Sequence, residues 1–222
     1  MKTIDKLLFG LLFGFSFPVF FFMMALTIWY YLFQNFNVLY FVLPGLITGI
    51  LADAIYLKKL INIALNLPTW ILAGFYLFNN ICIYGFFMGF PVFNLGMGII
   101  AGYYFGIRIN HENYPLKQVE YLKKSVPLFT AFIMLLICIS SGLIALFDKT
   151  LGLELQGMFR LKFQVTKGMI ISIIIIGGIA LIVIQYFLTK IIMTRTIKNL
   201  NISNTISYNS ELLIMPDNNH EN

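Results

Sequence analysis

Six long apolar runs, separated by short polar segments, make up most of this chain. An α-helix crosses the hydrocarbon core of a membrane with about 20 mainly apolar residues, and the runs approach or exceed that length. We therefore predict an all-α integral membrane protein with one six-helix transmembrane domain over residues 1–195. The expected spans cover residues 7–33, 36–57, 69–88, 92–107, 126–147 and 168–193.

Proline and glycine interrupt several of these spans. Pro18 follows Gly14 in the first span, and Pro44 lies in the first third of the second. Proline favours a bend in a helix because it lacks the backbone N–H. Gly89 and Pro91 fit the end of the third span and the start of the fourth. Since the segment around them is apolar, we expect this turn to lie within the membrane interface and not in water.

Glycines recur at a helical spacing in the third and fourth spans. Gly85 and Gly89 are four residues apart, and so are Gly98, Gly102 and Gly106. Positions four residues apart differ by only about 40° around a helix, so they form a slowly slanting strip. Small residues allow transmembrane helices to approach closely. We expect these five glycines to mediate helix packing at the centre of the bundle.

One segment follows a different period. From Leu153 to Thr166, apolar and polar residues alternate on either side of Gly157. Odd positions hold Leu153, Leu155, Phe159, Leu161, Phe163 and Val165, and even positions hold Glu154, Gln156, Arg160, Lys162 and Gln164. A two-residue period is typical of a strand and not of a helix. We expect a short hairpin or extended segment here, in the last outside loop, with an irregular interfacial loop as the alternative.

The end of the chain has a different composition. After Thr194 it becomes rich in asparagine and loses its apolar period. Segments of this kind bury too little apolar surface to order themselves. We predict a flexible polar cytoplasmic tail over residues 196–222.

The composition agrees with a membrane protein. Only 11% of the 222 residues are charged, against roughly 25% in ordinary soluble domains, and 59% are hydrophobic. The net charge of +6 does not indicate nucleic acid binding, because the basic residues flank apolar spans. Cys82 and Cys138 both fall inside predicted spans and have neither disulfide nor metal-site spacing.

The basic residues also predict the orientation. With six spans, both termini lie on one side, and the segments of that side hold eleven of the fifteen lysines and arginines. Because cytoplasmic segments carry an excess of basic residues, we expect both termini to be cytoplasmic. A prokaryotic plasma membrane is the expected location. The eleven are Lys2, Lys6, Lys58, Lys59, Arg108, Lys117, Lys123, Lys124, Lys190, Arg195 and Lys198; the outside segments hold Lys149, Arg160, Lys162 and Lys167.

Asp53 is the acid that falls within a predicted span. Intramembrane charges are rare, and each is by default a functional candidate. Asp53 lies about one turn from the end of its span, however, and reaches the interface from there. We favour a structural pairing, with Arg108 or the hydroxyls of Tyr103 and Tyr104 as partners, over a role in lining a substrate path.

Asn79 and Asn80 lie near the middle of the third span. Consecutive helical positions point about 100° apart, so at least one of the two amides is expected to face the bundle. An interhelical hydrogen bond is the simpler interpretation, and a polar lining for a ligand is the functional one. Asn94 and Gln185 are further amides, but their predicted depths place them too far apart for all four to meet.

The sequence carries no motif for catalysis. His111 and His220 stand alone, and no acid–base pair, nucleophile–base pair or metal-ligand spacing is present. We therefore expect no enzyme activity, no cofactor and no metal, with the lipid bilayer and a membrane protein as partners and no nucleic acid. A small permease or the membrane subunit of a transport system is the favoured function, because interrupted helices and mid-depth amides are typical of transporters. A non-catalytic scaffold or partner-binding subunit is the alternative.

Overall fold

The computed structural model describes residues 9–10, 12–14, 16–87, 89–112, 114–148, 150–152, 156–157, 160 and 165–214. These residues form helices and connecting turns, without a strand. Six of the helices are long and apolar enough to cross a membrane, which confirms an all-helical, multi-pass architecture. In chain order the elements are α2 (Ser16–Leu32), α3 (Leu39–Ile63), the 3-10 helix η1 (Ala64–Asn66), α4 (Thr69–Phe86), the 3-10 helix η2 (Pro91–Asn94), α5 (Leu95–His111), α6 (Leu116–Phe147) and α8 (Lys167–Ile214).

Two helices are longer than the spans that were predicted from their apolar runs. Helix α6 begins at Leu116, directly after Pro115, so it includes polar turns ahead of the apolar span that was expected from residue 126. Its added turns consist largely of leucine, lysine, glutamine and glutamate, which favour helix without being apolar. Helix α8 continues past the expected end at residue 193 as far as Ile214. The division into a domain and a flexible tail over 196–222 stays a prediction.

The proposed hairpin over residues 153–166 lies mostly outside the described residues. Of that segment, Gln156 and Gly157 are helical and Arg160 lies in a turn. Residues 153–155, 158–159 and 161–164 are not described. The extended segment therefore stays a prediction.

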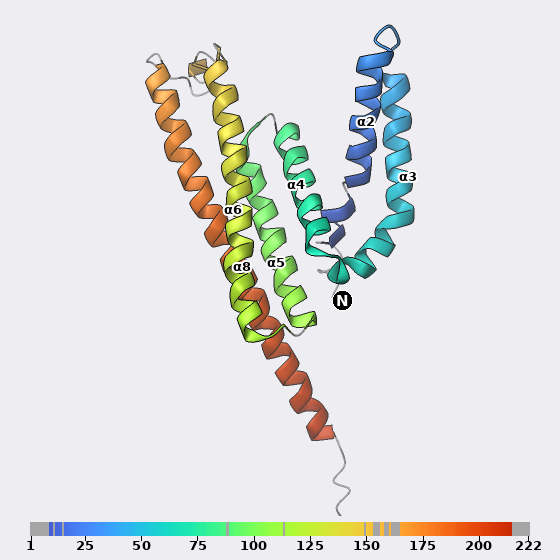
Figure 1. The fold of residues 1–222 in the computed structure, drawn as a ribbon, viewed down its shortest axis with the longest axis vertical. Helices are drawn as coiled ribbons and strands as arrows, with labels where there is room; N and C mark the ends of the chain where they lie inside the picture. The colour runs from blue at the N-terminus through green and yellow to red at the C-terminus, as the bar shows by residue number, and fades with distance from the viewer. Residues whose placement is uncertain are drawn as a thin grey trace, which may run out of the picture.

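Successive helices alternate in direction, and they fall into two groups (Figure 1). Helices α4, α5, α6 and α8 lie together, while α2 and α3 form a hairpin that diverges from α4 towards the turn between them. The turn joining α4 to α5 ends below the tips of α6 and α8, in keeping with its apolar sequence. At the opposite end, α8 extends well beyond the other helices.

Close packing of α5 on α8 forms the centre of the larger group. A Cβ atom added at Gly98 would lie 2.6 Å from Gln185 Nε2, and one at Gly102 would lie 2.6 Å from the backbone oxygen of Thr189. At Gly106 the added atom would lie 2.6 Å from Thr196 Cβ. Real Cβ atoms do not approach other heavy atoms this closely, so only glycine fits these positions at this helix separation.

The two glycines beside the α4–α5 turn have other surroundings. A Cβ atom added at Gly85 would meet no heavy atom of the described residues within 4 Å. Gly89 has a φ angle of 81°, a conformation that side chains disfavour, and it ends α4 in the turn. The role of this pair in packing stays a prediction.

The α2–α3 hairpin also depends on glycine. An added Cβ at Gly45 would lie 2.6 Å from Ala25 Cβ, and one at Gly49 would lie 2.5 Å from Pro18 Cα. Helix α3 has 25 residues, of which Gly49 alone is buried and the others are exposed or half-buried. An apolar cleft of about 420 Å³ separates α2 from α4, and Gly74 lies in its wall.

Candidate ligand-binding site in the membrane domain

The amides of Asn79 and Asn80 are buried within the bundle. Asn79 Nδ2 donates to the backbone oxygens of Leu12 and Phe75, each at 2.8 Å, and to Ser16 Oγ at 3.3 Å. Asn80 Nδ2 donates to the backbone oxygen of Tyr76 at 2.8 Å. Asn79 thus joins α4 to the N-terminal helix, which agrees with the interhelical interpretation of this pair.

Asn94 and Gln185 lie closer to Asn80 than the sequence suggested. Asn94 Nδ2 donates to the backbone oxygen of Asn80 at 2.8 Å and to Asn80 Oδ1 at 3.0 Å. Gln185 Nε2 donates at 3.2 Å to the hydroxyl of Tyr76, one turn before Asn80. Asn94 thus meets Asn80 despite the depth expected for it, while no hydrogen bond among the described residues joins Gln185 or Asn94 to Asn79.

Two features account for the difference. The α4–α5 turn is recessed relative to α6 and α8 (Figure 1), and Asn94 follows it at the end of η2, where its amide reaches Asn80. The apolar part of α8 runs from Lys167 to Leu200, so Gln185 lies near its middle and not near its end.

Two buried threonines lie next to these amides. Thr189 follows Gln185 by one turn of α8, and its Oγ1 lies 3.1 Å from Thr130 Oγ1 on α6. Both threonines are almost fully buried. We refer to Tyr76, Asn80, Asn94, Thr130, Gln185 and Thr189 together as the polar cluster.

The polar cluster has spare hydrogen-bond acceptors. Asn94 Oδ1 and Gln185 Oε1 are buried and have no partner among the described residues. A buried polar atom without a partner costs about 1–3 kcal/mol, so structures normally supply one. A water molecule or a polar ligand group is suited to these positions.

A cavity of about 540 Å³ lies between α4, α5 and α6 beside the polar cluster. Tyr76 and Thr130 belong both to the cluster and to the cavity wall. This volume falls within the range of small-molecule sites, about 300–1,000 Å³, which are mainly apolar with a few polar groups. The lining residues are Leu12, Thr69, Trp70, Leu72, Ala73, Tyr76, Ala101, Tyr104, Phe105, Tyr121, Leu122, Ser125, Val126, Phe129 and Thr130.

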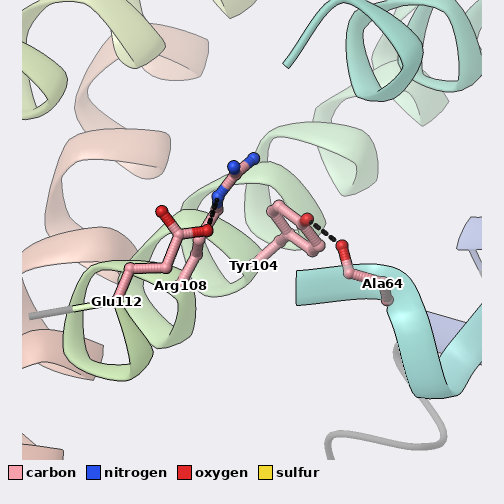
Figure 2. A network of polar contacts seen from close by, with 4 residues as sticks. All are labelled: Ala64, Tyr104, Arg108 and Glu112. Atoms are coloured by element: carbon pink, nitrogen blue, oxygen red, sulfur yellow. Dashed lines mark hydrogen bonds and ion pairs between the residues drawn. The ribbon is translucent and has the colours of Figure 1, made fainter. Parts of the chain in front are cut away.

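Arg108 lies one turn beyond Tyr104 on α5. Its Nε lies 2.9 Å from Glu112 Oε1, while its Nη1 is buried and has no partner among the described residues. The hydroxyl of Tyr104 donates to the backbone oxygen of Ala64 at 2.5 Å. Figure 2 shows the guanidinium of Arg108 beside the ring of Tyr104. In the loop that follows, burial raises the pKa of Tyr114, which keeps this hydroxyl protonated at neutral pH.

Two of the partners suggested for Asp53, Arg108 and Tyr104, have other hydrogen bonds. Arg108 pairs with Glu112 and Tyr104 with Ala64, as described above, and Asp53 Oδ1 is buried without a partner among the described residues. A Cβ atom added at Gly14 would lie 3.4 Å from Asp53 Oδ2. Asp53 also lines a pocket on α3 with Leu57 and Lys58. No hydrogen bond among the described residues joins it to Asn79 or Asn80, and a shared lining role for the three residues stays a prediction.

No family model, curated protein or solved structure matches this chain. The cavity, the polar cluster and Arg108 are therefore the features from which a function can be inferred. Within the described residues, no group of three or more histidine, cysteine, aspartate or glutamate side chains is placed to hold a metal ion.

Sequence reasoning did not identify Tyr76, Thr130 or Arg108 as site residues. Arg108 was counted among the basic residues that flank the spans, yet it is buried. Tyr76 lies one turn before Asn80, and this spacing was the available sign that the two share a helix face. Thr130 has no comparable sign, because its position depends on how α6 packs against α8.

Proposed function

We propose that this protein is a small permease, or the membrane subunit of a transport system, that binds its substrate inside the helix bundle. The observation that supports this function is the cavity of about 540 Å³ between α4, α5 and α6. Its wall is mainly apolar, and Tyr76 and Thr130 connect it to the polar cluster. Apolar walls with a few directed polar groups are typical of small-molecule sites.

The interrupted helices support the same proposal. The chain between α4 and α5 turns at Gly89 and Pro91, and its tip is recessed relative to α6 and α8 (Figure 1). Pro44 and Pro127 lie inside α3 and α6. Transporters often build substrate sites where helices are broken within the membrane. Glycine-mediated packing of α5 on α8 would hold this region together.

The charge distribution supports a cytoplasmic position for both termini, in a prokaryotic plasma membrane. Lys117, Lys123 and Lys124 belong to α6 at the same end of the bundle as the start of α4 (Figure 1). An excess of basic residues marks the cytoplasmic side. The cavity would then open nearer the cytoplasmic face. We propose no catalytic role.

The test is co-purification of a small molecule that depends on the cavity. Ala73 lines the cavity, so Ala73→Phe fills part of it, while Ala180→Phe makes the same change at an exposed position of α8. Each protein is purified in lipid nanodiscs, and its extracted small molecules are identified by mass spectrometry. We expect one compound to be retained by the wild type and by Ala180→Phe and depleted in Ala73→Phe. Equal retention by all three folded proteins would exclude the cavity as the binding site.

A partner-binding role is the second candidate, and the α2–α3 hairpin favours it. Among the residues of α3, only Gly49 is buried, so this helix has a large surface available to lipid or to another membrane protein. Photo-crosslinking in native membranes from Ile47 on α3, with Leu143 on α6 as the control, tests this role. Both side chains are exposed. A defined protein adduct from Ile47 alone is expected if the hairpin binds a partner, and lipid adducts alone from both positions would exclude it.

A further inference from the structure

Arg108 is a buried cation with unused hydrogen-bonding capacity. The residue is 8% exposed, its Nε pairs with Glu112, and its Nη1 has no partner among the described residues. Arginine side chains near the ends of membrane helices normally extend their guanidinium group into water. A guanidinium that remains buried needs acceptors for its N–H groups, and one acceptor is missing here.

Arg108 is not itself part of the cavity wall, but Tyr104, one turn before it on α5, is. Tyr104 lies in the cavity wall, and Figure 2 shows the guanidinium of Arg108 beside its ring. The Tyr104 hydroxyl donates to the backbone oxygen of Ala64, and Arg108 Nη1 has no hydrogen-bond partner among the described residues. An anionic group that passes Tyr104 from the cavity would find in Arg108 Nη1 a donor without a partner.

The cavity wall changes character along its length. Apart from the hydroxyl groups of Tyr76, Tyr104 and Thr130, its buried part is apolar, with Leu72 and Ala101. Trp70 and Tyr121 also line it but are 75% and 69% exposed. Aromatic rings with one polar end are typical of the level of the lipid headgroups. An occupant that is apolar along its body and polar at one end suits this gradient.

The charges at this end of the bundle favour an anion. The stretch from the end of α5 to the first turns of α6 carries Arg108, Lys117, Lys123 and Lys124, against Glu112 and Glu120. Glu112 is already paired with Arg108. Arginine is well suited to carboxylate and phosphate groups, because its planar donors match their oxygens.

We propose that the cavity binds a single-chain amphiphile with a carboxylate or phosphate head. The head accepts a hydrogen bond from Arg108 Nη1, and the chain lies along α5 between α4 and α6. This inference rests on the proposed function, since it names the class of substrate for the same cavity. It assigns to Arg108 the recognition of charge and to the cavity wall the recognition of the chain.

The test uses 11-(dansylamino)undecanoic acid and its methyl ester, which differ in charge and share the chain. Trp70 lines the cavity, so a Trp29→Phe background leaves it as the single tryptophan donor for energy transfer to the dansyl group. We expect saturable binding, with the acid at least about tenfold tighter than the ester. Arg108→Gln should remove this preference while retaining binding of the ester, and Arg108→Lys should keep part of it. Arg195→Gln is the control for a basic residue elsewhere.

The outcomes separate this inference from the proposed function. Equal affinity for acid and ester in the wild-type protein overturns charge recognition, whether or not any variant folds, and leaves the cavity as a binding site. If neither ligand binds to Ala73→Phe and the wild-type protein shows no preference for the acid, charge recognition is likewise overturned and the cavity remains the binding site. Dodecyl phosphate should compete with the acid, whereas inorganic phosphate at equal concentration should not. Competition by inorganic phosphate would overturn the amphiphile in favour of a plain anion site.

Discussion

Asn94 donates from one amide nitrogen to two oxygens of Asn80, the backbone oxygen at 2.8 Å and Oδ1 at 3.0 Å. The two residues lie on either side of the α4–α5 turn, so this contact fixes the position of the turn relative to α4. Asn94 is fully buried, so both bonds are shielded from bulk solvent.

Replacing Asn94 by aspartate should destabilise the protein more than replacing it by alanine. An ionised aspartate has no donor and would place oxygens against both Asn80 acceptors. Buried acceptors without partners cost about 1–3 kcal/mol, so a clear fall in the detergent melting temperature is expected for Asn94→Asp. Asn62→Asp, at an exposed site, is the matched control. Equal melting temperatures for the two aspartate variants would show that the Asn94–Asn80 contact contributes little.

Gly102→Leu should destabilise the bundle, while Gly96→Leu should be tolerated. A Cβ atom at Gly102 would lie 2.6 Å from the backbone oxygen of Thr189, whereas one at Gly96 meets no described atom within 4 Å. Overpacking of this kind costs about 1–3 kcal/mol. The melting temperature in one detergent decides the question. Equal tolerance at both positions would contradict the packing of α5 on α8.

Alanine should have opposite effects at Gly49 and Gly74. The added methyl group at Gly49 would lie 2.5 Å from Pro18 Cα, so Gly49→Ala must separate α2 from α3. At Gly74 the methyl group enters the cleft between α2 and α4 without contacting a described atom. Alanine is the better helix former by about 1 kcal/mol, so Gly74→Ala should be neutral or stabilising. Thermal unfolding of both variants provides the measurement, and a stabilised Gly49→Ala would contradict the tight hairpin.

Asp53→Asn should leave folding yield and any measured transport nearly unchanged. Asp53 Oδ1 has no partner among the described residues, so the amide keeps the shape of the side chain and removes a buried charge. Yield and melting temperature after purification test the structural part. Loss of a proton-linked activity in the folded variant would instead give Asp53 a functional role.

Cysteine labelling can test the orientation. A membrane-impermeant maleimide added to intact cells should label Met158→Cys and not Ser210→Cys. This follows from the excess of basic residues in the segments on the side of both termini. Each variant is labelled again after the cells are opened, which controls for access to the thiol. Labelling of Ser210→Cys alone in intact cells would show that the protein has the opposite orientation.

The membrane architecture could be predicted from the sequence because hydropathy reports directly on burial in lipid. The helix ends were less predictable. Polar helix formers after Pro115 extend α6, and hydropathy carries no signal for them. The sequence suggested where helices approach closely, through Gly98, Gly102 and Gly106, without identifying the helix that approaches. The structure places α8 there.

The site was less accessible to sequence reasoning than the fold. Asn79 and Asn80 stood out as amides in an apolar span, but their donors are used by backbone oxygens inside the bundle. The cavity depends on the relative positions of α4, α5 and α6, which no local pattern encodes. Arg108 was grouped with the basic flanks because its burial follows from how α5 lies within the bundle, and not from its neighbours along the chain.

Helix α8 extends well beyond the other helices at one end of the bundle (Figure 1). Among the residues of α8 up to Leu200, the last buried one is Ile197, and the helix continues to Ile214, about 25 Å further on. A tilt of about 10° about Ile197 would move that far end by about 4 Å, since the helix rises 1.5 Å per residue. Gln185 and Thr189 of this helix contact Tyr76 and Thr130, which line the cavity. A small tilt of α8 against these two residues would therefore displace its far end more than its buried part.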